Sequence, residues 1–126
     1  MSNMRTPMSR VRGLGAARTG TQHFWHQRLT AIANVPLTVA MVLLIMSLLS
    51  RNHAYVVQTL RSPVVSILML LFIVSAVYHM KLGMQVIIED YVHDEGPKFV
   101  LLIANIFFSI AIGLAAVYAV LNLSGV

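Results

Sequence analysis

A histidine lies in the middle of a long apolar stretch of this chain, a position where a polar side chain is costly. The residue is His79, and apolar residues surround it from about Val64 to Ile88. Placing an ionisable side chain in hydrocarbon costs on the order of a few kcal/mol, and such residues mark functional sites by default. Because imidazole is also the commonest protein ligand for metals, His79 is a candidate metal ligand.

An acid and a tyrosine follow at the end of the same apolar stretch. Asp90 and Tyr91 are adjacent in sequence, eleven and twelve residues after the histidine. A phenol donates a hydrogen bond without carrying charge, so it can hold a neutral carbonyl in a low-dielectric pocket. Quinone reduction consumes two protons with two electrons, and a neighbouring carboxylate could relay them. This pair is therefore a candidate quinone site, although Tyr91 could equally be an aromatic residue that anchors the membrane interface.

Helical geometry relates the two positions. Residues eleven apart in a helix differ by roughly 20° in direction and about 16 Å in height, so His79 and Asp90 share one stripe. Gly83, one turn from His79, leaves room for a flat macrocycle. Imidazole is a common axial ligand of haem iron, and the other histidines lie outside the apolar stretches, at His23, His26, His53 and His93. We expect a second haem ligand to come from another chain, and a plain hydrogen bond from His79 to a neighbouring helix is the alternative.

Composition indicates that the chain works in a membrane. Its residues are 58% hydrophobic and 10% charged, whereas soluble domains carry about 25% charged residues. The absence of cysteine excludes disulfides and thiolate ligands for iron–sulfur clusters. The net charge of +5 does not indicate nucleic acid, because five arginines lie in the N-terminal 28 residues and all four acids lie within seven residues. These are Arg5, Arg10, Arg12, Arg18 and Arg28, and Glu89, Asp90, Asp94 and Glu95.

Three stretches are long enough to cross a bilayer as helices. They run from about Leu29 to Leu49, Val64 to Ile88 and Phe99 to Leu121, each near the roughly 20 residues that a span needs. Short connections predict antiparallel neighbours in one bundle. The sequence therefore predicts an all-α membrane protein with three transmembrane helices, divided into a basic arm at residues 1–27 and an anchor domain at 28–126.

The distribution of charge predicts how the chain is oriented. Positive residues favour the inner side of a membrane, so the N-terminus is expected inside and the C-terminus outside. Polar residues within the spans, such as Asn34, Lys81 and Asn105, normally face other helices or a cavity. Three helices offer few such faces, so we expect packing against a partner anchor subunit.

The residues around His79 resemble a known family. The string His79-x3-Gly83-Met84-x5-Asp90-Tyr91-Val92-His93 is similar to the signature of the D-type membrane-anchor subunits of succinate dehydrogenase, also called succinate:quinone oxidoreductase or Complex II. Three spans, the short arm and the run Arg28-Leu29-Thr30-Ala31 add to the resemblance. It covers most of the chain and is most specific at the His-Gly-Met-Asp-Tyr spacing.

The resemblance implies a role for each candidate residue. His79 would be one axial ligand of haem b, which a cytochrome b556-type C subunit shares, and Arg28 would lie near the haem propionates and the quinone pocket. Arg28 is otherwise a charge that flanks the first span. Tyr91 and Asp90 would help to bind ubiquinone. Lys81 points about 160° away from His79 on a helix and is not expected at the haem.

The resemblance also implies partners and a location. The chain would anchor a flavoprotein and an iron–sulfur subunit to a membrane and contribute to an enzyme without performing dicarboxylate chemistry itself. A bacterial inner membrane is favoured over the mitochondrial inner membrane. Two alternatives stay open: a haem-free structural or assembly subunit, and a small transporter subunit in which Lys81, His79 and Asp90 form a proton path.

Overall fold

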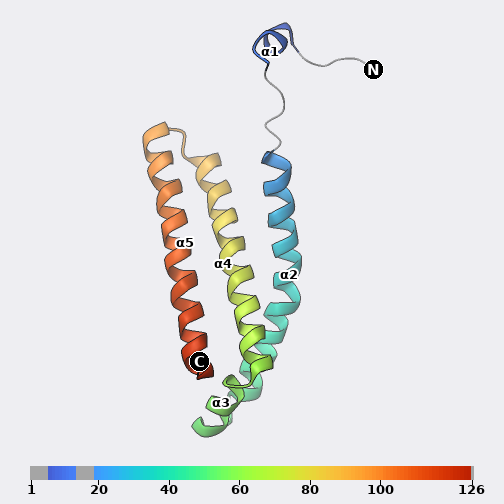
Figure 1. Cartoon of the computed structure of the whole chain (residues 1–126), viewed down its shortest axis with the longest axis vertical. Coiled ribbons are helices and arrows are strands. Elements are labelled where there is room, and N and C mark those ends of the chain that lie inside the picture. Colours follow the sequence, from blue (N-terminus) through green and yellow to red (C-terminus); the bar gives the residue numbers. More distant parts are fainter. Residues whose placement is uncertain (1–5, 14–18, 126) are drawn as a thin grey trace, which may run out of the picture.

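The computed structural model of the protein describes residues 6–13 and 19–125, and within these ranges every regular element is a helix. The helices are α1 (Pro7–Val11), α2 (Thr19–Leu48), α3 (His53–Leu60), α4 (Pro63–Tyr91) and α5 (Glu95–Ser124) (Figure 1). The predicted all-α class is confirmed. Arg5 and Arg18 of the predicted basic arm lie outside the described residues.

Three of these helices are long and apolar enough to cross a membrane, as predicted. The candidate spans are Gly20–Leu48, Pro63–Tyr91 and Glu95–Ser124, with 29, 29 and 30 residues. At 1.5 Å per residue each is about 44 Å long, whereas the hydrocarbon core of a bilayer is about 30 Å thick. The helices therefore continue past the hydrocarbon at their ends. Which end faces the inside stays a prediction from the charge distribution.

The first long helix begins ten residues before the predicted start of the first span at Leu29. The helix starts at Thr19, so the last nine residues of the predicted arm, 19–27, are helical. Hydropathy locates the hydrocarbon, but a helix satisfies its backbone hydrogen bonds internally and needs no change at the water boundary. As a consequence His26 and Gln27 lie on α2, one turn before the apolar residues begin.

The connection between the first two spans contains a short helix that was not predicted. The Asn52 side chain caps α3 by accepting a hydrogen bond from the Tyr55 backbone N–H at 2.9 Å. The next helix begins with Pro63 at its first position, where proline is tolerated, one residue before the predicted start of the second span at Val64. The helix α3 contacts both α4 and α5.

The second long helix, α4, lies between the other two. It packs against α2 on one side and α5 on the other, and successive long helices run antiparallel (Figure 1). Few side chains are buried in the described part of the chain: Leu82, Ile88 and Val120 among apolar residues, and Ser66, Asn105 and Ser109 among polar ones. Most of the apolar surface therefore faces outward, where lipid or a partner would cover it.

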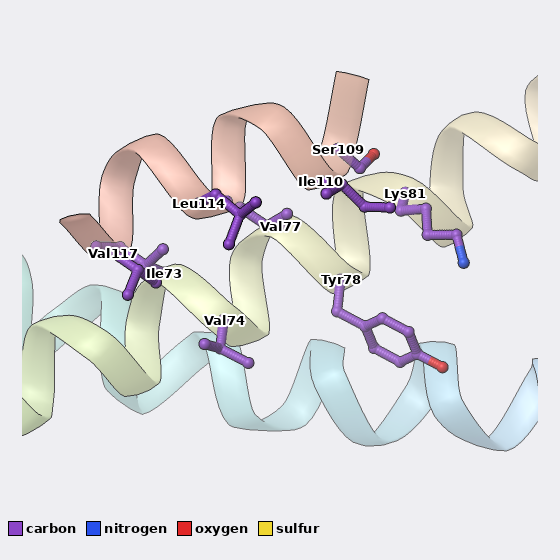
Figure 2. A pocket seen from close by; sticks show the side chains of 10 residues that line it. Ile73, Val74, Val77, Tyr78, Lys81, Ser109, Ile110, Leu114 and Val117 are labelled. Carbon is purple, nitrogen blue, oxygen red and sulfur yellow. The ribbon is translucent and has the colours of Figure 1, made fainter. Parts of the chain in front are cut away.

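A polar contact and a close approach join α4 to α5. The Asn105 side-chain Nδ2 donates to the Lys81 carbonyl oxygen at 3.0 Å. At Gly113 an added Cβ would stand 3.4 Å from Cγ1 of Val77, so the two helices are close there. Between them runs an apolar groove of about 370 Å³ that Lys81 and Ser109 also line (Figure 2).

Candidate functional site

The histidine at residue 79 lies in the middle of α4 and contacts α2. Its ring is half-buried, and Nδ1 lies 3.0 Å from the hydroxyl oxygen Oγ1 of Thr30. The same hydroxyl donates within α2 to the carbonyl oxygen of His26 at 2.8 Å or of Gln27 at 3.1 Å. One nitrogen of the His79 ring is therefore engaged with this chain. The other, Nε2, is the nitrogen that can bind a ligand.

A cavity of about 250 Å³ opens beside the histidine between α2 and α4. It is lined by Phe24, Gln27, Arg28, Ala31 and His79. The Arg28 guanidinium carbon lies 5.2 Å from the centre of the Phe24 ring, a cation–π distance. The two residues predicted to bind a cofactor, His79 and Arg28, thus line one cavity although they are 51 positions apart in sequence.

The glycine one turn after the histidine also faces this region. A Cβ added to Gly83 would stand 3.9 Å from Nε2 of Gln27, which is an ordinary contact distance. Because Gln27 lines the cavity, Gly83 keeps α4 free of a side chain next to it. This is the side of α4 on which the sequence predicted clearance.

Lysine 81 lies on another side of α4, as its helical angle predicted. It lines the groove toward α5, and its Nζ lies 6.0 Å from the centre of the Tyr78 ring. Figure 2 shows both side chains at the same end of that groove. Lys81 is not among the residues that line the cavity with His79.

The predicted quinone pair occupies the last turn of α4. Asp90 and Tyr91 are both exposed, and the relative exposure of Tyr91 is 79%. This end of α4 lies at the same end of the bundle as the start of α2 and the start of α5 (Figure 1). The structure keeps the pair separate from the cavity at His79, so the two candidate sites lie at different heights along one helix.

Two residues of this region were not singled out from the sequence. Tyr78 Oη lies 2.8 Å from Nδ1 of His26, so neighbouring residues of α4 hydrogen-bond to α2 one turn apart. Thr30 was part of the Arg28-Leu29-Thr30-Ala31 run but had no assigned role. Its partner could not be identified without knowing which face of α2 packs against α4.

The arrangement can hold a metal only with help from a cofactor or a partner. In residues 6–13 and 19–125 there is no group of three or more His, Cys, Asp or Glu side chains that could hold an ion. A haem iron would need only one or two side-chain ligands from protein, because the macrocycle supplies the others. The residues present fit such a group: His79 has one engaged and one available nitrogen, and Arg28 offers a cation in the same cavity.

Comparisons with known proteins agree on one family. A sequence model described as "Succinate dehydrogenase/Fumarate reductase transmembrane subunit" matches residues 2–115. A succinate dehydrogenase hydrophobic membrane anchor subunit of Rickettsia bellii is 32% identical over 120 residues, covering 94% of each chain. One from Paracoccus denitrificans is 28% identical over 114 residues, covering 90% of this chain and 88% of its own. No solved structure matches significantly.

Proposed function

The chain belongs to the succinate dehydrogenase/fumarate reductase transmembrane subunit family, and we propose that its His79 is an axial ligand of haem b and that its Tyr91 and Asp90 help to bind quinone. It is a membrane anchor subunit of succinate dehydrogenase. The observation that carries the haem assignment is the meeting of His79 and Arg28 in one cavity between α2 and α4. The two residues are far apart in the sequence, and their positions in the chain did not by themselves place them in one cavity.

The histidine suits axial ligation through Nε2. Its Nδ1 is engaged by Thr30 at 3.0 Å, which orients the ring and leaves Nε2 as the ligating atom. Metal-bound histidines nearly always use their second nitrogen for such a contact. Haem b, when bound, supplies a one-electron carrier within the membrane. Among the described residues, His79 is the one histidine that lines this cavity, so a histidine of the partner C subunit would provide the second ligand.

The arginine suits recognition of the haem propionates. A guanidinium group pairs with carboxylates through two parallel hydrogen bonds. Arg28 lies near the start of the apolar part of α2, and its guanidinium carbon is 5.2 Å from the centre of the Phe24 ring. Its side chain would hold the propionate edge of the haem there.

The acid–tyrosine pair suits quinone binding at the membrane edge. Tyr91 would donate a hydrogen bond to a quinone carbonyl, and Asp90 would pass on protons from the aqueous side. Full reduction takes up two electrons, which would arrive from the iron–sulfur subunit, and two protons, one at each carbonyl oxygen. Because Tyr91 is 79% exposed, other subunits must cover it to form a closed pocket. Ubiquinone is the quinone that the family resemblance favours.

The remaining partners follow from the role of an anchor. The chain would join a flavoprotein, an iron–sulfur subunit and a cytochrome b556-type C subunit in the inner membrane of a bacterium. Succinate chemistry would take place outside this chain. Most of its apolar surface is exposed, which leaves ample area for the C subunit and for lipid.

A proton-path transporter is less well supported by the geometry. That alternative needs Lys81, His79 and Asp90 to line one route. In the structure His79 lines the cavity beside α2 whereas Lys81 lines the groove beside α5, and α4 itself separates them. The other alternative, a haem-free anchor, predicts a purified complex without a haem b signal in its absorption spectrum.

Difference spectra of the purified complex test the haem assignment. We expect a reduced-minus-oxidised haem b signal in the wild type and its loss in His79→Ala. His53→Ala is the matched control, because His53 is an exposed histidine at the start of α3. A full haem signal in His79→Ala, or none in the wild type, would falsify the assignment.

Kinetics of quinone reduction test the second site. Tyr91→Phe removes one hydroxyl, and the loss of a neutral hydrogen bond of about 0.5–1.5 kcal/mol predicts a rise in the quinone KM of roughly 2- to 13-fold. Succinate oxidation with a soluble electron acceptor should be unchanged. Tyr118→Phe is the control, because Tyr118 is an exposed tyrosine on α5. Unaltered quinone kinetics in Tyr91→Phe would remove this residue from the site.

A further inference from the structure

We propose that Thr30 is a positioning residue for the haem ligand: its hydroxyl accepts a hydrogen bond from Nδ1–H of His79 and thereby fixes which nitrogen binds iron and how strongly. This inference rests on the proposed function, since it concerns the same histidine. It adds a residue of α2 to a ligand that α4 provides.

The proton of the Thr30 hydroxyl decides the direction of the bond. A hydroxyl has one proton and two lone pairs. The oxygen Oγ1 lies 2.8 Å from the His26 carbonyl oxygen and 3.1 Å from that of Gln27, and a carbonyl can only accept. With its proton directed along its own helix, Thr30 turns a lone pair toward His79, 3.0 Å away. The ring nitrogen Nδ1 is then the donor.

This direction fixes the form of the imidazole. A neutral ring has one N–H and one lone pair, so a proton on Nδ1 leaves the lone pair on Nε2. The ligating form is thus stabilised before any metal binds. Approach of iron to Nδ1 is also blocked, because Thr30 already occupies that side of the ring.

The register of α2 against α4 holds Thr30 in place. Tyr78, the residue before the histidine, bonds through Oη to Nδ1 of His26 at 2.8 Å, one turn before Thr30 on α2. Two consecutive residues of α4 are therefore tied to two positions one turn apart on α2. Sliding α2 by one turn would break both contacts, so the Tyr78 bond keeps the Thr30 hydroxyl level with the ring.

The bond should also tune the electronic properties of the ligand. An acceptor at Nδ1–H draws the proton away from the ring and makes Nε2 a more basic donor. A more basic donor stabilises ferric iron more than ferrous iron and lowers the midpoint potential. Loss of outer-shell partners of this kind typically weakens metal binding 10- to 100-fold. A tenfold loss confined to the ferric state would raise the potential of this one-electron couple by about 59 mV.

The test replaces Thr30 in the whole complex and measures the haem itself. Thr30→Val keeps the shape and removes the hydroxyl, whereas Thr30→Ser keeps the hydroxyl. Thr38→Val makes the same exchange two turns away on α2, at an exposed threonine. The readouts are the haem midpoint potential from a redox titration, the electron paramagnetic resonance spectrum of the ferric haem, and the haem content per complex.

We expect Thr30→Val to raise the midpoint potential, change the ferric spectrum and reduce haem retention, while Thr30→Ser and Thr38→Val stay close to the wild type. If Thr30→Val prevents assembly, Thr30→Ala removes the hydroxyl without the branched side chain, and the same shift is expected. A wild-type potential and spectrum in a hydroxyl-free variant, with haem absent from His79→Ala, would refute the role of Thr30 alone. Full haem content in His79→Ala would instead refute the ligand assignment.

Discussion

Replacing Arg28 by alanine should weaken haem binding by an amount that the cavity allows us to work out. The arginine shares its cavity with His79, and a charge-assisted hydrogen bond to a propionate contributes about 1.5–3 kcal/mol. In the structure the guanidinium lies over Phe24 at 5.2 Å. Leaving that ring would cost about 0.5–1 kcal/mol.

The difference of these two terms is the expected effect on haem affinity. It amounts to about 0.5–2.5 kcal/mol, and because 1.4 kcal/mol is a factor of ten, haem binding should weaken roughly 2- to 60-fold. Removing a positive charge near the haem also favours ferric iron, so the midpoint potential should fall. This is opposite in sign to the shift expected for Thr30→Val, which makes the two effects separable in one titration.

The assay is haem retention by the purified complex during dilution in detergent, followed by absorbance and normalised to the amount of anchor chain. Arg51→Ala is the matched control, because Arg51 also lies over an aromatic ring, 5.1 Å from the centre of Tyr55, but at the other end of α2. Arg28→Lys should fall between wild type and alanine, since lysine keeps the charge without the planar fork. Equal haem retention in Arg28→Ala and wild type, or an equal loss in Arg51→Ala, would refute the reasoning.

Three further changes test the packing around the site. Asn105→Leu removes the hydrogen bond to the Lys81 carbonyl and should lower the free energy of unfolding by about 0.6 kcal/mol, and at most about 1.7 kcal/mol. A detergent denaturation series measures this change, and the control Asn122→Leu, at an exposed residue, should leave the free energy of unfolding unchanged. Lys81→Met should leave the haem content, measured by absorbance, within about twofold of wild type, because an uncharged side chain is less costly in hydrocarbon and Lys81 lines the groove beside α5. A loss of haem as large as that in His79→Ala would contradict this prediction. Gly113→Leu should lower assembly of the complex, measured by native gel, since its Cβ would already stand 3.4 Å from Val77, whereas Gly113→Ala should assemble normally.

Much of the fold could be predicted from the sequence because a helix that crosses the hydrocarbon of a bilayer must be apolar and of a fixed minimum length. Uninterrupted apolar stretches near 20 residues predict spans, and the three spans were found. The start of the first long helix was not predicted, because nothing at the water boundary ends a helix: α2 begins at Thr19 and not at Leu29. The helix α3 was missed because eight residues are only about two helical turns, too short a segment for a helical pattern to stand out between two spans, although Asn52 was an available N-cap.

The candidate site could be predicted in part. Spacing along one helix was enough to separate the directions of His79 and Lys81, and the structure places them on different sides of α4. The contact between Thr30 and His79 was not predictable, because it depends on the rotation of α2 about its axis. Single spans that are apolar on nearly every face carry no amphipathic signal from which that rotation could be inferred.

The central claim is that His79 of this chain binds haem iron. The most direct test is an electron cryo-microscopy structure, at side-chain resolution, of the assembled succinate dehydrogenase in a membrane mimic. We predict iron bonded to Nε2 of His79, Thr30 within hydrogen-bond distance of Nδ1, and Arg28 at the propionate edge. The claim is contradicted if the iron has other axial ligands, or if a helix of the partner subunit fills the cavity beside His79 and no haem is present.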